Sequence, residues 1–221
     1  MPAPTAPALA LFDLDGTLTR HDTLLPYVFG FLAHHPRGYL GLPALLPAVG
    51  RFILGSAGRG ALKADLLRAT LAGRKRTELE PWTGRFVHDV ARRGCYAQAL
   101  DQVAAHRAAH HHLVLLSAST DLYVPRLGEA LGFAQVVCTG VEWAGDALVG
   151  NLTTPNRRGQ EKVRVLSQLR AQWPGVPVIA YGNAASDIAH LRLADQGFLV
   201  NGNSHARRVA ASVGVPCLTW R

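Results

Sequence analysis

Residues 8–14, ALALFDL, form a short apolar run that predicts a buried strand, but the next such run begins only at Leu113. Between them, residues 22 to about 109 show helical patterns alone. From His112 onward, strands and helices alternate, as is typical of a parallel α/β sheet. If the first strand belongs to that sheet, the helical stretch is an insertion. We expect it to lie over the carboxyl edge of the sheet, where open α/β sheets bind ligands.

This organisation predicts two parts, an α/β core formed by residues 1–20 and 107–221 and an inserted helical cap formed by residues 21–106. The length of 221 residues is sufficient for one core with a large insertion. Within the cap, Thr77 and Glu80 predict a capping box that begins a helix ending at Arg93. In the core, residues 136–143 and 147–152 flank Ala-Gly-Asp, which predicts a hairpin.

The charge balance favours anionic partners, because 23 basic residues face 15 acidic ones and the net charge is +8. Phosphate, anionic lipid and nucleic acid would all be attracted by this positive charge. We do not expect nucleic acid, since there is no basic run interleaved with aromatics and no zinc-finger spacing. The three cysteines are far apart and build no disulfide framework. With no targeting pattern at residues 1–10, we expect a cytoplasmic protein without an obligate protein partner.

The most hydrophobic region is Leu24–Leu54, which four prolines and two arginines interrupt. Its uncharged piece Gly38–Gly50 has 13 residues, too few for a simple transmembrane helix. Two interpretations stay open. The preferred one is the packed interior of a helical cap, and the alternative is a lipid-facing surface that makes weak contact with a membrane.

Asp13 and Asp15 stand at the end of the first strand, within Asp-Leu-Asp-Gly-Thr. Carboxylates at positions i and i+2 of an extended chain point the same way. Such a pair is costly unless a cation lies between the two or one of them is protonated. Gly16 lets the chain turn sharply. The motif therefore predicts a site for Mg²⁺ and an anionic substrate, although an ordinary Asp-Gly turn would look the same.

Polar residues also stand at the other strand ends or at the starts of the following helices. Ser117 follows the strand 113–116, and Lys162, one of only three lysines, lies in the first turns of a helix. Asn183 and Asp187 follow the strand 176–181 at spacing i, i+4. Each alone has an ordinary explanation as a helix cap or a solvated face. Together they predict one polar site at the sheet edge.

In this order, the motifs resemble those of the haloacid dehalogenase (HAD) superfamily of phosphohydrolases, subfamily IB, the branch similar to phosphoserine phosphatase. Phe12–Leu18 resembles the DxDGT motif, Leu115–Ser119 the second motif, Lys162 the third and Gly182–Asp187 the GDxxxD fourth motif. The resemblance implies a Rossmann-like parallel sheet with an all-helical cap of the C1 type. It covers nearly the whole chain.

The resemblance also implies roles for these residues. Asp13 would be the nucleophile that forms an aspartyl-phosphate, and Asp15 would act as general acid and then base. Ser117 and Lys162 would hold the phosphoryl oxygens. Mg²⁺ would be bound by Asp13, the backbone carbonyl of Asp15, and the two residues of the fourth motif, Asn183 and Asp187.

One position departs from the family pattern, because Asn183 stands where the family has Asp. An amide oxygen can ligate Mg²⁺ but brings no charge. We therefore expect weaker metal binding with activity retained, and a catalytically weakened protein that only binds phosphate ligands is the alternative.

The expected substrate is a small or lipid-linked phosphate ester. By the resemblance, Asp22 and the Ser117–Ala118 segment would contact it. Asp22 stands where phosphoserine phosphatases have Glu, and Ala118-Ser119 replaces their Gly-Gly, which weakens the case for phosphoserine. Relatives with a similar second motif include phosphatases of phosphatidylglycerophosphate, so a lipid phosphatase of that type is a further alternative.

Overall fold

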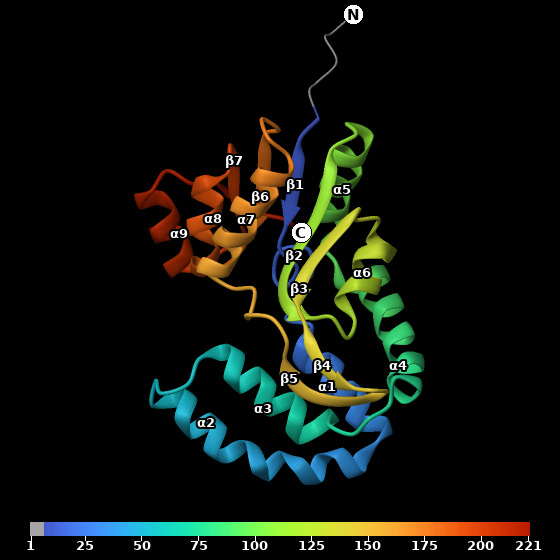
Figure 1. Cartoon of the computed structure of the whole chain (residues 1–221). Helices are drawn as coiled ribbons and strands as arrows, with labels where there is room; N and C mark the ends of the chain where they lie inside the picture. Colours follow the sequence, from blue (N-terminus) through green and yellow to red (C-terminus); the bar gives the residue numbers. More distant parts are fainter. Residues whose placement is uncertain (1–6) are drawn as a thin grey trace, which may run out of the picture.

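The strand that leads to Asp13 lies inside a six-stranded parallel sheet (Figure 1). This computed structural model describes residues 7–221, and the strand order in the sheet is β3-β2-β1-β6-β7-β8. The strands are β1 (Leu9–Phe12), β2 (His112–Thr120), β3 (Gln135–Thr139), β6 (Val178–Gly182), β7 (Gln196–Val200) and β8 (Cys217–Leu218). β1 pairs with β2 on one side and β6 on the other, which confirms that the first strand belongs to the distant α/β sheet.

Helices cover both faces of this sheet because its central strands are apolar on both. Alternate residues of β1 enter different cores, Ala10 and Phe12 on one face and Leu9 and Leu11 on the other. The helices of the core are α5 (Ala97–Ala108), α6 (Val124–Leu131), α7 (Gln160–Gln172), α8 (Ile188–Leu193) and α9 (Ser204–Ser212), with the 3₁₀ turn η3 (Ala185–Asp187). The predicted α/β fold class is thereby confirmed.

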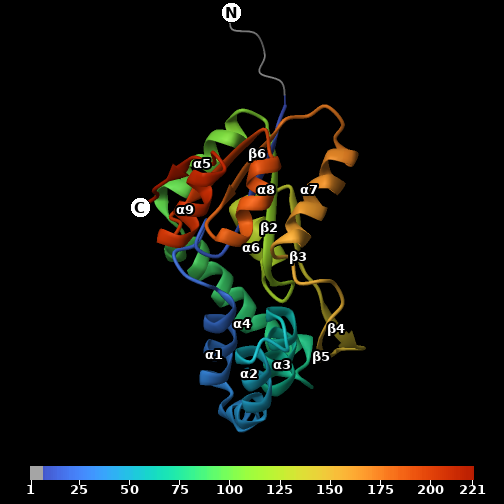
Figure 2. The ribbon, with the colours of Figure 1, turned by 90° about the vertical axis from the view of Figure 1, so that its left-hand side faces the viewer.

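The inserted residues form a helical layer beyond the end of the sheet, as Figure 2 shows. Its elements are α1 (Leu24–His34), the 3₁₀ segment η1 (Pro36–Leu45), α2 (Leu46–Ile53), α3 (Arg59–Leu71), α4 (Arg76–Asp89) and the π-helical turn η2 (Val90–Gly94). The predicted capping box is wrong by two residues. Lys75 is the N-cap of α4, and its backbone N–H donates to Glu78 Oε1 at 3.1 Å. Glu78 rather than Glu80 therefore reaches back to the cap.

Two elements do not follow the predicted boundary between core and cap. The boundary at 106/107 cuts through α5, whose Ala99 and Val103 are buried beside the sheet. The hairpin of β4 (Val141–Ala144) and β5 (Ala147–Leu152) comes from the core part of the sequence but joins the cap, since Gly73 N–H donates to Leu148 O at 2.8 Å (Figure 1). We propose to count the hairpin with the cap and all of α5 with the core.

The predicted strand 136–143 is in fact two strands that belong to different sheets. β3 ends at Thr139 in the main sheet, and β4 begins at Val141 in the hairpin. Gly140 lies between them, and a Cβ at this position would come within 2.4 Å of Thr153 Oγ1. A close approach that only glycine permits therefore separates the two strands.

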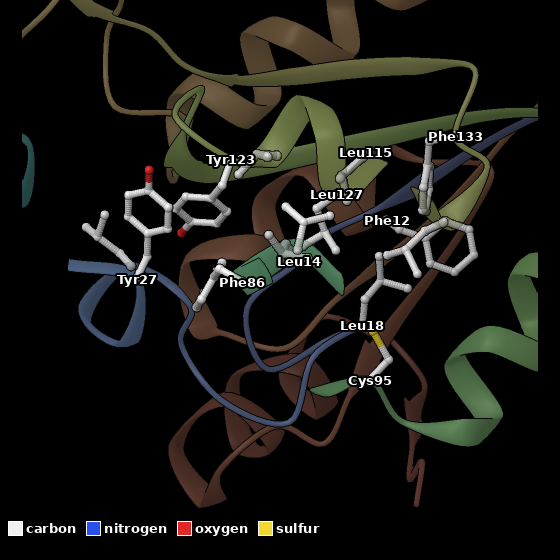
Figure 3. Packing of buried hydrophobic residues seen from close by; sticks show 14 of the residues in the cluster. Phe12, Leu14, Leu18, Tyr27, Phe86, Cys95, Leu115, Tyr123, Leu127 and Phe133 are labelled. Carbon is white, nitrogen blue, oxygen red and sulfur yellow. The ribbon is translucent and has the colours of Figure 1, made fainter. Parts of the chain in front are cut away.

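Aromatic packing joins the cap to the core, as Figure 3 shows around Tyr27, Phe86 and Tyr123. Tyr27 of α1 stacks on Tyr123, which immediately precedes α6, with ring centroids 4.7 Å apart. Phe86 of α4 meets the edge of both rings. Tyr27 and Tyr123 are fully buried, so this contact fixes the start of α1 above the end of the sheet.

The apolar segment 24–54 does not behave as one unit. α1 buries Leu24, Tyr27, Val28, Phe31 and Leu32, which lie on one helical face. In contrast, η1 has no buried residue, and α2 buries only Ala48. The prediction that the segment forms the interior of a helical cap is therefore wrong for residues 36–54. Prolines and glycines make η1 a 3₁₀ run without a continuous buried face.

Within residues 7–221, no helix combines the length and the hydrophobicity needed to cross a bilayer.

Candidate active site

Asp13 follows β1 directly and lies between the carboxyl ends of β2 and β6. Its side chain is buried, and both carboxylate oxygens have partners. Lys162 Nζ donates to Oδ1 at 2.6 Å, and Thr17 Oγ1 donates to Oδ2 at 3.0 Å. These two contacts hold the carboxylate in one orientation toward the space between sheet and cap.

Lys162 of α7 joins two carboxylates that are far apart in the sequence. Its Nζ lies 2.6 Å from Asp13 Oδ1 and 2.8 Å from Asp187 Oδ1. Asp187 is oriented in turn by its own loop, because the backbone N–H groups of Asn183 and Ala184 donate to Oδ2 at 3.2 and 3.0 Å. The structure thus brings the predicted first, third and fourth motifs into direct contact.

Burial and mutual charge determine how these three groups titrate. Burial raises the pKa of Asp13 to about 6, although Lys162 opposes the shift. Burial alone would raise the pKa of Asp187 as well, but the Lys162 ammonium lowers it to about 2. For Lys162, burial favours the neutral form, yet the two carboxylates outweigh it and raise its pKa. Lys162 is therefore a permanent cation, whereas Asp13 keeps a high affinity for a proton or another cation.

Gly16 determines where Asn183 lies. Its φ is +79°, and a Cβ there would come within 2.0 Å of the Asn183 side-chain nitrogen. Both the left-handed backbone and the close approach require glycine. The turn after Asp15 and the fourth motif are therefore packed against each other, as the sequence predicted for residues of one site.

Asp15 is anchored to the beginning of the cap. Thr23 donates to Asp15 Oδ1 twice, from its backbone N–H at 2.7 Å and from its hydroxyl at 2.6 Å. Ser119 Oγ donates to Oδ2 at 2.6 Å. Burial raises the pKa of Asp15, the nearby Asp22 adds to the shift, and these hydrogen bonds reduce it. A carboxyl group whose pKa is raised suits the role of general acid.

The second motif is arranged differently from the sequence prediction. Ser117 is fully buried, and its Oγ accepts the Ser119 N–H at 3.0 Å. Ala118 and Ser119 line the cavity beside Asp15, whereas Ser117 lies beneath them. Sequence reasoning missed Ser119, although its hydroxyl is two residues beyond Ser117 and so on the same side of an extended chain.

Asp22 lies at the cavity and caps the first helix. Its Oδ1 accepts the backbone N–H groups of Leu24 and Leu25 at 3.0 and 3.4 Å. Its side chain is exposed and lines the same cavity as Asp13. The structure therefore places Asp22 near a bound substrate, with part of its hydrogen-bonding capacity used by α1.

The cap contributes a lysine that sequence reasoning did not single out. Lys63 of α3 donates to the carbonyl of Ala118, and to Asn156 Oδ1 at 2.7 Å. Burial lowers its pKa to about 8, with Asp15 opposing the shift. Lys63 thus spans from the cap to the second motif. Its rarity among 23 basic residues was the only sequence signal.

These groups surround one cavity of about 520 Å³ between the cap and the carboxyl edge of the sheet. Its polar lining comes from both parts of the chain: Asp13, Asp15, Asp22, Arg59, Lys63, Ser119, Asn156, Arg158, Lys162, Asn183 and Asp187. Four of these side chains are cationic and four are carboxylates, a combination that suits a phosphate ester bound together with a metal cation.

The donor set at the floor of the cavity fits Mg²⁺. The predicted ligands Asp13, Asn183 and Asp187 line the same cavity and offer oxygen atoms only, as does the backbone carbonyl of Asp15. Within the described residues, no group of three or more His, Cys, Asp or Glu could hold a metal ion. Mg²⁺ is nevertheless commonly bound by one or two carboxylates together with substrate phosphate and water. Two carboxylates and one amide meet that requirement.

Comparison with known proteins agrees with this geometry. The model of the haloacid dehalogenase-like hydrolase family matches residues 10–192, which include all four motifs, and the chain belongs to this family. CicA of Caulobacter vibrioides is 30% identical over 192 residues, covering 86% of this chain and 84% of CicA. A Mycobacterium tuberculosis protein named Probable phosphatase is 26% identical over 225 residues, covering 99% and 77% of the two chains.

Solved structures show the same architecture. A protein of unknown function from Bordetella pertussis Tohama I superposes with a TM-score of 0.79 at 25% identity, covering 97% of this chain and 99% of the other. A phosphoserine phosphatase solved as a phospho-aspartyl intermediate analogue superposes with a TM-score of 0.67 at 15% identity, covering 97% and 94%. At that identity the likeness concerns the fold alone, including the cap.

Proposed function

We propose that this protein is a Mg²⁺-dependent phosphomonoester hydrolase that works through an aspartyl-phosphate intermediate on Asp13. The observation that carries the proposal is the contact of Asp13 with Lys162 at the floor of the cavity, with Asp15 on the same turn. Membership of the haloacid dehalogenase-like hydrolases and the similarity to a Probable phosphatase support this reaction class.

In the first step, a carboxylate oxygen of Asp13 attacks the phosphorus atom and the bond from phosphorus to the ester oxygen breaks. Asp15 gives its proton to that oxygen, so the product leaves as an alcohol. Lys162 offsets the negative charge of Asp13, which would otherwise repel a dianionic phosphate. Lys162 holds the phosphoryl oxygens in this proposal, whereas Ser117 lies beneath the cavity lining and supports the second motif through its contact with the Ser119 N–H.

In the second step, Asp15 removes a proton from water, and the water oxygen attacks the aspartyl-phosphate. The bond between phosphorus and Asp13 breaks, which releases inorganic phosphate and restores both carboxyl groups to their starting states. Bound between Asp13, the carbonyl of Asp15, Asn183 and Asp187, Mg²⁺ would supply positive charge that brings the two anions together.

The hydrogen bonds of Asp15 fit its double role. Thr23 and Ser119 keep the carboxyl group in place while it gives up and regains its proton. Because Thr23 immediately precedes α1, the position of the proton-transfer group depends on the cap. In this proposal the cap therefore positions the Asp15 carboxyl group, in addition to enclosing the substrate.

The test is a screen of sugar, amino-acid, nucleotide and lipid phosphates, phosphoserine included, with and without Mg²⁺. Asp13→Asn should lower turnover by several orders of magnitude, as nucleophile removal does in other hydrolases. Asp101→Asn, an exposed position on α5, is the matched control. Hydroxylamine should release phosphate from a trapped intermediate of the wild-type protein only.

Near-normal turnover by Asp13→Asn would refute the aspartyl-phosphate mechanism. Binding of phosphate esters without turnover of any of them would instead favour the phosphate-binding alternative. Asn183 is the observation behind that alternative, because it removes one negative charge from the metal ligands.

A further inference from the structure

The active-site cavity has an apolar wall opposite its polar floor. The wall comes entirely from the cap and consists of Leu24, Leu25, Phe29, Leu45, Val49, Phe52, Leu62 and Leu66. The polar groups that would act on phosphate lie at the other side. Such a lining is typical of sites in which a few polar groups fix one end of a ligand and apolar side chains surround the rest.

A small polar phosphate would leave this wall in contact with water. An apolar group attached to the phosphate would remove that surface from water, which is the main favourable contribution to binding. The lining therefore points to a phosphate ester whose other end is an alkyl or acyl group.

The outer surface of the cap beside this wall is also apolar. We define the outer cap face by the side chains of Leu40, Leu46, Ile53 and Leu54, which are 82%, 72%, 76% and 83% exposed. They belong to η1, α2 and the residue after α2, which follow the edge of the molecule remote from the sheet (Figures 1 and 2). The other large exposed apolar residues of the described chain are Leu25, Phe29, Tyr39 and Val49, also in the cap, and Trp173 and Leu193 in the core.

The helical periodicity of α2 makes the outer cap face continuous with the cavity. Successive helical residues are about 100° apart, so Ala48, Phe52, Val49 and Ile53 follow one another around the same side of the helix. Ala48 is buried, Phe52 and Val49 line the cavity, and Ile53 is exposed. One apolar arc thus runs from the cap interior across the cavity wall to the surface.

The segment that carries this surface has charges of a single sign. Residues 23–64 contain no Asp or Glu but carry Arg37, Arg51, Arg59 and Lys63. Arg51 pairs with Asp65 at 3.1 Å, whereas Arg37 and Arg59 are exposed. An exposed apolar face flanked by cations is complementary to an anionic bilayer, in which apolar side chains enter the acyl region and cations meet the headgroups.

We infer that the outer cap face lies on an anionic membrane surface and that the cavity takes the phosphate monoester headgroup of a lipid from that surface. The substrate part of this inference rests on the proposed function, whereas the membrane contact does not. Both parts follow from the same arc of α2, because a lipid whose acyl chains lie along the apolar wall can remain in contact with the bilayer.

Flotation with vesicles tests the membrane contact without any catalysis. Asp13→Asn protein is mixed with vesicles of phosphatidylcholine alone, or of phosphatidylcholine with phosphatidylglycerol, at low and high salt. We expect flotation with the anionic vesicles only, weakened by salt because screening acts over roughly 8–10 Å near physiological ionic strength. The double change Ile53→Ser and Leu54→Ser should lower this binding at least about tenfold, since it removes two large apolar side chains that would enter the acyl region.

Leu193→Ser is the matched control, because it removes an exposed leucine from α8 in the core and should leave flotation unchanged. Absence of flotation with anionic vesicles would overturn the inference, and so would equal binding to neutral vesicles or equal loss in the control. A concentration-dependent dimer in light scattering, abolished by the double change and without vesicle binding, would assign the face to a second copy of the chain and also overturn it.

The substrate part is tested with wild-type protein on an aryl phosphate, glycerol phosphate, a monomeric short-chain phosphatidic acid and long-chain phosphatidic acid in vesicles. We expect the highest kcat/KM for the vesicle lipid, and the double change should lower that value while leaving the aryl phosphate unaffected. Turnover of the aryl phosphate without preference for either lipid would overturn the inference and leave the proposed function intact. No turnover of any ester would refute the proposed function, and flotation would then decide the membrane contact alone.

Discussion

The hydroxyl of Thr23 lies 2.6 Å from Asp15 Oδ1, so the residue that begins the cap donates a hydrogen bond to the proposed general acid. The same hydroxyl lies 2.8 Å from Tyr123 OH, which belongs to the aromatic contact between cap and core. Asp15, Thr23 and Tyr123 therefore form one hydrogen-bonded chain. Through this chain, the seating of the cap on the core determines where the proton-transfer group lies.

Thr23→Val tests this connection. A hydrogen bond to the carboxylate favours its ionised form, so its removal should raise the pKa of Asp15 further. The expected increase is about one to two pH units, because such a bond contributes roughly 1.5–3 kcal/mol. The alkaline limb of the pH–rate profile for an alkyl phosphate should move upward by that amount. Thr23→Ser keeps the hydroxyl and should keep the wild-type profile, and a shared shift would show that the hydroxyl is not the cause.

Asn183→Asp should strengthen Mg²⁺ binding, because the added carboxylate brings negative charge to the proposed ligands. We expect the Mg²⁺ concentration for half-maximal effect to fall on the order of tenfold. Asp187→Ala should raise it. Activity measured against Mg²⁺ concentration and the Mg²⁺-induced rise in Tm give two independent measurements. Unchanged Mg²⁺ dependence in both variants would place the ion elsewhere or exclude it.

Lys63 should make substrate binding depend on alkaline pH. Its pKa is lowered to about 8, so it is charged below that pH and neutral above it. We therefore expect KM for an anionic substrate to rise as pH increases through about 8. Lys63→Met should remove this pH step and raise KM at neutral pH by roughly tenfold, the effect of losing one charge-assisted hydrogen bond. Lys63→Arg should keep the low KM and move the rise in KM above the measurable pH range. If the rise near pH 8 persists in Lys63→Met, it does not come from Lys63.

His106 should make stability depend on acid pH. It is buried and lies 2.9 Å from Tyr181 OH and 2.7 Å from His111 Nδ1, and burial lowers its pKa to about 4, with His111 adding to the shift. In the unfolded chain His106 binds a proton near pH 6.5, whereas in the folded protein it binds that proton only near pH 4. This group therefore removes stability as pH falls through that window.

The measurement is the free energy of unfolding in urea between pH 7 and pH 4. His106→Gln should lose less stability than the wild type over this range, and His205→Gln, at an exposed position on α9, should match the wild type. Asp13 acts in the opposite direction, because its raised pKa adds stability as pH falls through about 6. The difference between the two histidine variants isolates the effect of His106, and equal slopes would refute it.

Residues at strand ends could be predicted because their position follows from local pattern. Asp13 and Lys162 are 149 positions apart, yet each stands beside a sheet element whose place in an α/β fold is known in advance. Ser119, Thr23 and Lys63 were missed because a hydroxyl or an amine shows no sequence signal of its hydrogen-bond partner. The partners of Thr23 and Ser119 depend on how the turn after β1 meets the cap, which is a long-range contact.

The error on residues 36–54 has the same origin. Hydrophobicity indicated burial, but burial also needs a face that another element can cover. The prolines of η1 prevent a regular helical stripe, and the apolar arc of α2 is only partly covered by the cap. Exposure of Leu40 and Ile53 was therefore a property of the packing and could not be read from the composition.

The parallel sheet, the inserted helices and the four motifs could be inferred from the amino-acid order, because alternating patterns and turn residues act over a few positions. Three relationships required the folded chain: Lys162 bridges Asp13 and Asp187, Thr23 holds Asp15, and α2 joins the cavity to the surface. Each of these depends on distances between segments far apart in the chain. Such distances follow from how apolar faces pack together, and many sequences with the same local pattern could pack them differently.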